Sequence, residues 1–236
     1  MMHKERGNIL FIILLAVVLF AALSYAVTGG GRVSEDQRIS TEKAQTVASQ
    51  IVNYTALLEN TVQRLRITNE CSDAQISFQN SVVSGYTSGA PTKCKVFDPA
   101  GGGMAWQTPD PSWLISQSDA NAQSAAGVDY GIYNIPTEVC VLGMGTGSCD
   151  SSAGTKDMII ALKYLNKKVC DAINDKLGIS PPPSDNCYAG ANGSKYVGTF
   201  FNGGQYICNA TRGMSTACVD TQGRTGYTYY RVLWAR

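Results

Sequence analysis

The chain has 236 residues, which is enough for one medium domain or two small ones beyond a membrane anchor. Only 16% of the residues are charged and the formal net charge is +1, so the composition excludes the strongly basic surface typical of nucleic-acid-binding proteins. A hydrophobic content of 44% excludes a largely disordered chain, while 24 glycines indicate a loop-rich exterior of mostly β type.

An apolar segment near the N-terminus predicts a membrane span. Residues 9–27 carry no charge, and as a helix they would be about 28 Å long, the thickness of the hydrocarbon layer. Lys4 and Arg6 outweigh Glu5 on the preceding side, which favours a cytoplasmic N-terminus and export of everything after Val27. A plain signal anchor and a cleaved secretion signal are the alternatives, although the segment is longer than the apolar core of most cleaved signals.

A second helix is predicted for residues 40–67, which contain neither proline nor glycine. Its apolar residues recur every three or four positions and would therefore lie along one face. They are Val47, Ile51, Tyr54, Leu58, Val62 and Leu65. Ser40 or Thr41 would cap the start of this helix. The glycines at 29–31 each cost a helix about 1 kcal/mol relative to alanine, so they predict a hinge between the span and the second helix.

The layout of these first 70 residues resembles the type IV pilin and pseudopilin superfamily. Members of that family carry a short basic leader that ends in glycine and is removed by an inner-membrane prepilin peptidase. Their long N-terminal helix is half membrane anchor and half amphipathic support for a globular β domain. The resemblance implies a leader at residues 1–7, cleavage between Gly7 and Asn8, and a transmembrane and filament-core helix at 8–28.

One position departs from the family pattern. Most members have a glutamate as the fifth residue after the cleaved glycine, where it is thought to neutralise the free amine of a neighbouring subunit. This chain has Ile12 at that position, and Glu5 lies in the leader instead. A carboxylate inside the bilayer is costly and is kept only for a partner. Within the family its loss is tolerated at the filament tip, so the resemblance implies a minor or tip subunit.

All eight cysteines lie beyond the apolar segment, and their even number predicts a disulfide framework in an oxidising compartment. They are Cys71, Cys94, Cys140, Cys149, Cys170, Cys187, Cys208 and Cys218. The connectivity does not follow from the sequence, but short loops favour Cys140–Cys149 and Cys208–Cys218 because their ends meet most often in the unfolded chain. No CxxC pair occurs and the only histidine is His3, so no zinc site is predicted.

Residues 71–236 are predicted to form one exported, disulfide-rich domain after the hinge and amphipathic helix at 29–70. Its first predicted elements are a strand or extension at 75–86, a surface loop at 98–111, a strand at 138–142, a glycine-rich turn at 143–147 and a helix at 155–177. Gly178 would end this helix, and Cys170 is expected to pin it to a neighbouring element.

Three strands at 195–201, 205–210 and 225–235 follow the prolines at 181–183, and they predict an antiparallel meander at the end of the domain. Packing this sheet on the long helix would bury the apolar faces of both. The predicted fold class is therefore α+β, with a long N-terminal helix packed on a disulfide-stapled antiparallel β domain that carries a second helix.

The exported part contains no histidine, so no Ser-His-Asp or Cys-His unit can form there, and oxidised cysteines leave no thiol nucleophile. The remaining candidate acids are Asp98, Asp110, Asp129 and Glu138, which we interpret as solvated loop acids. The turn at 143–147 lacks the lysine and hydroxyl of a phosphate-binding loop. We therefore expect neither enzymatic activity nor a cofactor or metal.

Two functions remain. The first is a structural subunit of a type IV pilus-like or pseudopilus filament, which would sit in the inner membrane before assembly and in a periplasmic or extracellular filament of identical or sibling subunits afterwards. The second is a single-span anchored binding or adhesion domain that does not polymerise. Its loop at 98–113, with Trp106 and Trp113, would contact a surface, glycan or partner protein. Such aromatic residues are, however, more often packed beneath a loop than exposed as ligand platforms.

Overall fold

The computed structural model divides the chain into two units, Met1–Arg38 and Ile39–Arg236. It describes residues 13–20, 39–87, 89–123, 129–145, 149, 153–180, 183, 194–202, 205–207, 209–220 and 226–236. Residues 13–20 are helical, and none of the helices within the described ranges is both long and apolar enough to cross a membrane. The predicted leader, its cleavage position, the ends of the predicted span and the glycine hinge lie outside the described residues.

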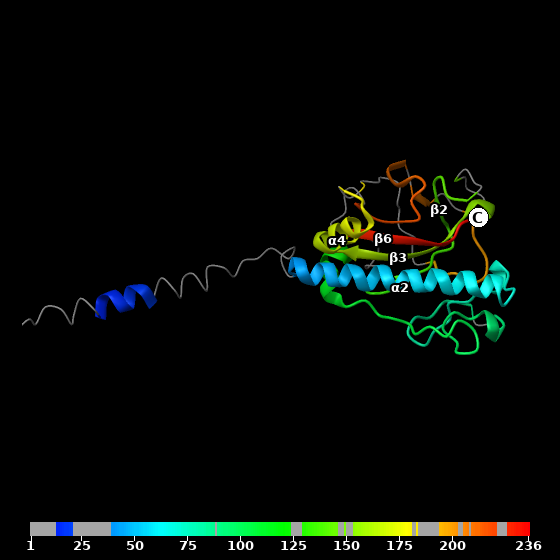
Figure 1. Cartoon of the computed structure of the whole chain (residues 1–236), viewed down its shortest axis with the longest axis horizontal. Helices are drawn as coiled ribbons and strands as arrows, with labels where there is room; N and C mark the ends of the chain where they lie inside the picture. The colour runs from blue at the N-terminus through cyan, green and yellow to red at the C-terminus, as the bar shows by residue number, and fades with distance from the viewer. Residues whose placement is uncertain are drawn as a thin grey trace, which may run out of the picture. The chain divides into compact units, whose positions relative to one another are not determined.

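A four-stranded antiparallel sheet with the order β1-β3-β6-β5 forms the centre of the second unit (Figure 1). Its strands are β1 (Tyr133–Asn134), β3 (Met158–Leu165), β5 (Thr216–Asp220) and β6 (Tyr227–Trp234). A second, parallel sheet pairs β2 (Val139–Val141) with β4 (Gln205–Ile207). The mixture of helices and an antiparallel sheet confirms the α+β class of this unit.

The helix α2 spans Thr41–Ile67 and confirms the predicted amphipathic helix. Ser40 is the cap, because its side-chain oxygen accepts a hydrogen bond from the amide of Lys43 at 3.2 Å. All six residues of the predicted apolar stripe are buried. The helix contacts β6 and α4 (Lys167–Leu177), as Figure 1 shows. The expectation that the sheet packs on this helix is therefore confirmed.

An apolar core covers each face of the four-stranded sheet. On the face toward α2, side chains such as Leu58 of the helix and Leu162 of β3 belong to the larger core. On the opposite face, Ile159 of β3 and Val219 of β5 pack with Val141 of β2. Because β3 is buried on both faces, its first five residues, 158–162, are an apolar run without alternation.

This double burial explains an error in the sequence prediction. The segment 155–177 was expected to be one helix, but its first half forms β3 and α4 begins only after Asn166, whose side-chain oxygen accepts from the amide of Val169 at 3.0 Å. A short apolar run has no periodicity that separates a buried strand from a helix. The end of the helix is correct, since Gly178 adopts the left-handed conformation with φ of 72°.

Two other predicted strands need correction. For residues 75–86, where a strand or a short extension was predicted, the structure shows no strand and only an isolated bridge between Ser77 and Lys95. Residues 195–201 are also without a strand, and β4 pairs parallel with β2 instead of joining an antiparallel meander. The C-terminal strand is confirmed as β6, while β5 lies in a segment for which the sequence predicted none.

The remaining elements are short and lie in the connections. They are η2 (Asp73–Gln75), η3 (Thr92–Cys94), η4 (Pro111–Trp113), α3 (Gln117–Gln123), η6 (Ala153–Thr155) and η7 (Asn209–Thr211). The loop predicted at 98–111 contains neither strand nor α-helix.

Three disulfides staple these elements: Cys71–Cys94, Cys140–Cys149 and Cys170–Cys218. The predicted pair Cys140–Cys149 is confirmed. The predicted pair Cys208–Cys218 is wrong, because Cys218 of β5 is bonded to Cys170 of α4 with a Cα–Cα distance of 5.4 Å. This bond pins α4 to the sheet, as expected for Cys170, and it shows that adjacency in the folded state outweighs the short loop.

We expect the double substitution Cys170→Ser with Cys218→Ser to lower the free energy of unfolding by about 2–4 kcal/mol, because this bond closes a long loop. The matched control removes Cys140 and Cys149, which close a loop of only nine positions and should cost less. Urea unfolding of the Ile39–Arg236 unit measures the free energy of unfolding of both double variants. A larger decrease on removal of Cys140–Cys149 than on removal of Cys170–Cys218 would contradict the dependence on loop length.

Non-reducing peptide mapping checks the rest of the framework. Cys187 and Cys208 lie outside the described residues, and with the other six cysteines paired they are the two that remain. We expect one peptide that joins them. Recovery of a peptide joining Cys208 to Cys218 would contradict the connectivity.

Candidate functional site

The structure places the two tryptophans of the predicted binding loop in different surroundings. Trp106 is half-buried and its ring lies 5.3 Å from the ring of Phe97, edge to face, and 6.3 Å from that of Tyr86. Trp113 lies in η4, where its carbonyl accepts a hydrogen bond from the amide of Asn166 at 3.0 Å. Both pack against the larger core, in line with the preference of such residues for positions beneath a loop, and Trp106 also borders a groove.

This groove, which we call the Trp106 groove, has a volume of about 440 Å³. Its lining includes the apolar side chains of Phe97, Met104 and Trp106 and the polar side chains of Gln79, Lys95 and Asp98. Aromatic and planar amide groups along one depression suit a small neutral polar ligand.

The walls of the groove are held by local hydrogen bonds. Asp98 accepts from the amide of Ala100 at 2.9 Å, and the Asn80 side-chain oxygen accepts from the amides of Val82 and Val83. Gly102 allows the loop to pack closely, since a Cβ there would lie 2.1 Å from the carbonyl oxygen of Val96. The groove is thus built on a fixed backbone.

Two polar atoms of the groove residues lack a partner within the described part of the chain. They are the indole nitrogen of Trp106, a donor, and the side-chain oxygen of Gln79, an acceptor. Buried polar groups are normally hydrogen-bonded, so this pair is an exception. Gln79 is not among the predicted binding residues, because the pattern of residues 75–86 indicates only a strand or an extension. The only signal for its place was the pair of cysteines that flank the segment, Cys71 and Cys94, which are bonded to each other.

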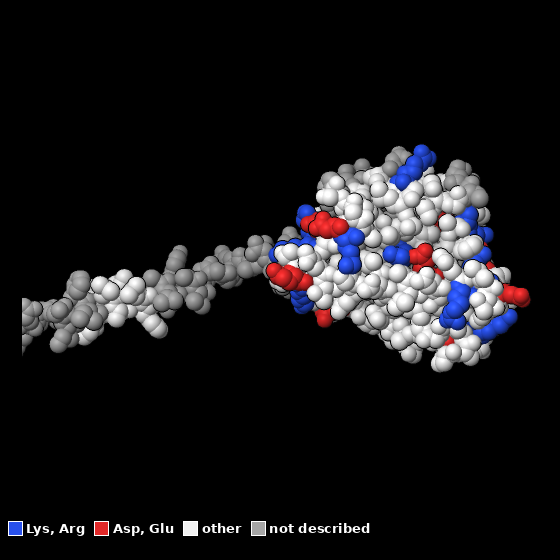
Figure 2. All heavy atoms as spheres, viewed as in Figure 1, with Lys and Arg blue, Asp and Glu red and all other residues white. Residues whose placement is uncertain are grey.

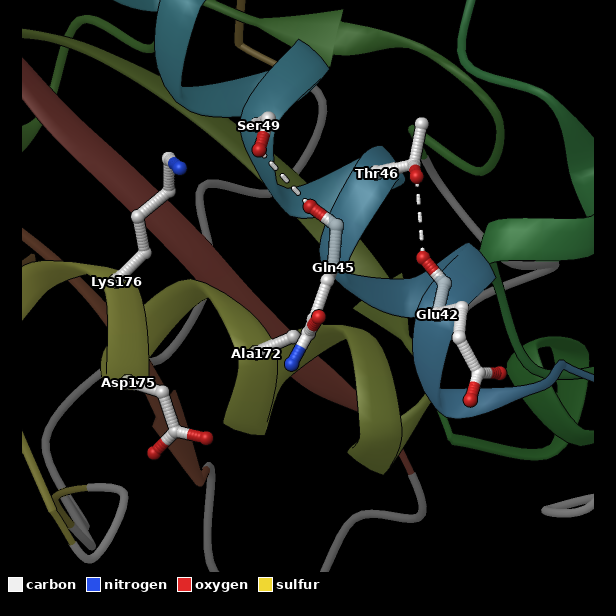
Figure 3. Close-up of a pocket in the computed structure, with 7 residues that line it drawn as sticks. All are labelled: Glu42, Gln45, Thr46, Ser49, Ala172, Asp175 and Lys176. Carbon is white, nitrogen blue, oxygen red and sulfur yellow. Dashed lines mark hydrogen bonds between the residues drawn. The ribbon is translucent and has the colours of Figure 1, made fainter.

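A second groove runs between α2 and α4 and is drawn in Figure 3. It has a volume of about 540 Å³ and is lined by Glu42, Gln45, Thr46 and Ser49 of α2 and Ala172, Asp175 and Lys176 of α4. The hydroxyls of Thr46 and Ser49 donate to backbone carbonyls of their own helix, four residues earlier. The side chains of Asp175 and Lys176 point in different directions in Figure 3. The groove is therefore a polar surface whose side chains point in several directions.

The outer face of α2 is unusual for a helix in contact with water. No charged residue occurs between Lys43 and Glu59, and the exposed positions of this stretch include Gln50, Asn53 and Leu57. Leu57 is 59% exposed. Figure 2 shows charged groups scattered over this side of the second unit, with areas of other residues between them. Exposed helix faces are ordinarily charged, so this face has the character of a contact surface.

The candidate acids named from the sequence do not converge on a catalytic centre. Asp110 caps η4, and its hydrogen bond from the amide of Ser112 lowers the pKa of the Asp110 carboxyl. Asp98 caps a turn, and Glu138 is partly exposed. Asp129 contradicts the interpretation as a solvated loop acid, because it is buried between two lysines. In the described part of the chain, no three acidic, histidine or cysteine residues are grouped as a metal site would require.

The domain should lose stability in strong alkali because several tyrosines are buried. Tyr54 lies behind the Trp106 groove, where its hydroxyl oxygen accepts from the amide of Gln107, and burial raises the pKa of Tyr54 to about 12. Burial likewise raises the pKa of Tyr196 to about 12. The unfolded chain ionises its tyrosines near pH 10 and so binds fewer protons than the native state above that pH.

We therefore expect the free energy of unfolding to fall as the pH rises from about 10 to about 12. Urea unfolding at pH 8 and at pH 11 measures the change. Tyr54→Phe keeps the ring but not the ionisable group. The free energy of unfolding of this variant should therefore fall less between these two pH values than that of the wild type. An unchanged pH dependence in this variant would contradict the assignment to Tyr54.

Comparison with known proteins adds no relative. No protein-family model, no curated protein and no solved structure matches this chain. The pilin resemblance therefore remains a prediction from the N-terminal residues, and the geometry of the second unit has to carry the functional argument.

Proposed function

We propose that the chain is a structural subunit of a type IV pilus-like or pseudopilus filament, in a minor or tip position. The observation that carries the proposal is α2. It is a 27-residue amphipathic helix with one face in the core of a disulfide-stapled α+β domain, and it follows an N-terminal apolar segment. We infer that the apolar segment serves as the anchor and that α2 supports the globular domain, as the pilin resemblance implies.

The outer face of α2 supports this function. Copies of a helical subunit pack around a common axis only if the faces that meet can be desolvated at small cost. The uncharged stretch between Lys43 and Glu59 meets that condition, because amide and leucine side chains lose little on burial compared with ions. A helix that served only as a support would gain solubility from charges there.

The disulfides support an exported position for the same domain. Three bonds staple it, which suits a periplasmic or extracellular location and not the reducing cytoplasm. The partners that follow from the proposal are other filament subunits, a prepilin peptidase and, before assembly, the inner membrane. The isoleucine at position 12 supports a minor or tip position, where no neighbour would require a carboxylate.

The N-terminal mass of the protein, isolated from sheared surface filaments and from the membrane fraction, tests the proposal. A mature start at Asn8, with or without a methylated amine, and recovery in the filament fraction are the expected results. A start at Met1 with all protein in the membrane fraction would overturn filament assembly. A start near Val27 would identify a secreted soluble protein and overturn the anchor as well.

The Trp106 groove favours a second candidate, an anchored binding or adhesion domain that does not polymerise. Its half-buried indole and the unpartnered donor and acceptor of Trp106 and Gln79 are the specific observation. Trp106→Ala should then abolish attachment of the soluble domain to a glycan-coated surface, whereas Trp113→Phe should not. Equal attachment of all three proteins would remove this candidate.

A further inference from the structure

A buried cluster of side chains joins β1 and β3. The side chain of Asp129 is only 2% exposed, and its carboxylate oxygens pair with two lysines. Oδ2 lies 3.1 Å from Nζ of Lys163, and Oδ1 lies 2.5 Å from Nζ of Lys195. The side-chain amide of Asn134, a fully buried residue, also donates to Oδ2 at 3.0 Å. One carboxylate oxygen therefore accepts hydrogen bonds from both the amine of Lys163 and the amide of Asn134.

The strand register brings these two side chains together. Asn134 of β1 lies opposite Ala161 of β3, and Lys163 is two residues farther along β3. Alternation along a strand puts Ala161, Lys163 and Asn134 on the same face of the sheet. Nζ of Lys163 and Nδ2 of Asn134 both bind Oδ2 of Asp129. These two nitrogen atoms therefore lie within two hydrogen-bond lengths of each other. Among the residues that the structure describes, the buried carbonyl oxygen of the Asn134 side chain has no hydrogen-bond partner.

The cluster brings an amine and a side-chain amide to one carboxylate. Lys163 is buried, and it shares the carboxylate of Asp129 with Lys195. A lysine amine is a nucleophile in its neutral form. Lys195 binds Oδ1, so Oδ2 serves the other two groups.

We propose that Lys163 and Asn134 join in an intramolecular isopeptide bond, with Asp129 as the proton carrier. Nζ of neutral Lys163 attacks Cγ of Asn134, so that an Nζ–Cγ bond forms and the Cγ–Nδ2 bond breaks. Oδ2 of Asp129 takes one proton from Nζ and gives it to Nδ2, which leaves as ammonia. The carboxylate is regenerated, and no oxidant, cofactor or metal enters the reaction.

The product would tie β1 to β3 by a bond that reducing agents do not break. The short strand β1 has only two residues and pairs with β3 at two positions, so a covalent link there would hold an otherwise weak edge. The proposal is independent of filament assembly, since it concerns only the exported domain.

Mass spectrometry of the purified full chain, fully reduced and denatured, tests the proposal. The expected result is a mass lower than that of the sequence by one ammonia molecule, together with a peptide in which Asn134 is joined to Lys163. An unmodified mass would overturn the proposal. Loss of ammonia without the linked peptide would also overturn it, because asparagine can lose ammonia by closing on its own backbone. Loss of water with a link to Asp129, or a link through Lys195, would overturn the assignment of residues.

Variants add a matched control. Lys163→Arg, Asn134→Ala and Asp129→Ala should each restore the full mass, whereas Lys195→Arg should keep the loss of ammonia because Lys195 binds the other carboxylate oxygen. Retention of the link in Asp129→Ala would overturn the role of the carboxylate. The result on the unaltered protein decides the main question if a variant fails to fold.

Discussion

Replacing Asn174 by alanine is expected to lower the free energy of unfolding by about 2–4 kcal/mol, because it leaves two buried backbone groups without partners. Asn174 lies in α4 and is fully buried. The side-chain nitrogen of Asn174 donates to the backbone carbonyl of Cys218 at 2.7 Å. Its side-chain oxygen accepts from the backbone amide of Cys218 at 2.9 Å. The side chain therefore completes the hydrogen bonding of β5 in place of a further strand.

The position of β5 explains why the effect should be large. β5 is an edge strand of the sheet. On the side that pairs with β6, Cys218 lies opposite Tyr229. The other side is covered by α4, which excludes water from the Cys218 amide and carbonyl. An unpartnered buried donor or acceptor costs about 1–3 kcal/mol.

Urea unfolding of the Ile39–Arg236 unit measures the Asn174→Ala effect. Asp171→Ala is a matched control on the same helix, since its ion pair with Lys167 is exposed and should contribute less than about 1 kcal/mol. A loss for Asn174→Ala no greater than that of the control would contradict the role of Asn174. Asn174→Asp should also destabilise the domain, because a carboxylate cannot donate to the Cys218 carbonyl.

The sequence predicted the elements whose pattern is local. The apolar stripe of α2 and its serine cap follow from helix periodicity and from the preference of the first position for a side-chain acceptor. Gly178 ends α4 for an equally local reason. The pair Cys140–Cys149 is close in sequence, so the nearest partner is also the correct one.

The errors concern features that depend on contacts between distant segments. β3 was read as helix because its burial on both faces comes from α2 and β2, which no local pattern reveals. Cys170 and Cys218 are 48 positions apart and become neighbours only when α4 packs on β5. The burial of Asp129 could not be predicted for the same reason, because Lys163 and Lys195 are distant in sequence and lie beside it only in the folded domain. The side of the Trp106 groove near Gln79 was not predicted, because Gln79 and Trp106 are distant in the sequence and lie together only in the fold.

Two adjacent leucines of α2 should differ sharply in their contribution to stability. Leu58 is fully buried in the larger core, whereas Leu57 is 59% exposed on the uncharged outer face. Leu58→Ala should lower the free energy of unfolding by about 2–5 kcal/mol, because it leaves a cavity between the helix and the sheet. Leu57→Ala should change it by no more than about 0.5 kcal/mol. Urea unfolding of the two variants measures the difference, and similar losses would contradict the orientation of α2.

A substitution on the outer face of α2 can distinguish an effect on assembly from an effect on folding. Leu57→Asp places a charge in the middle of the uncharged face, and it should leave the domain folded because the side chain does not touch the core. If that face packs against a neighbouring subunit, burial of the carboxylate should strongly reduce the amount of protein in the sheared filament fraction. Thr41→Asp, at the exposed start of α2, is the matched control with the same added charge outside the uncharged stretch. Wild-type yields from both variants would show that the outer face of α2 is not an assembly surface, whatever the mature N-terminus proves to be.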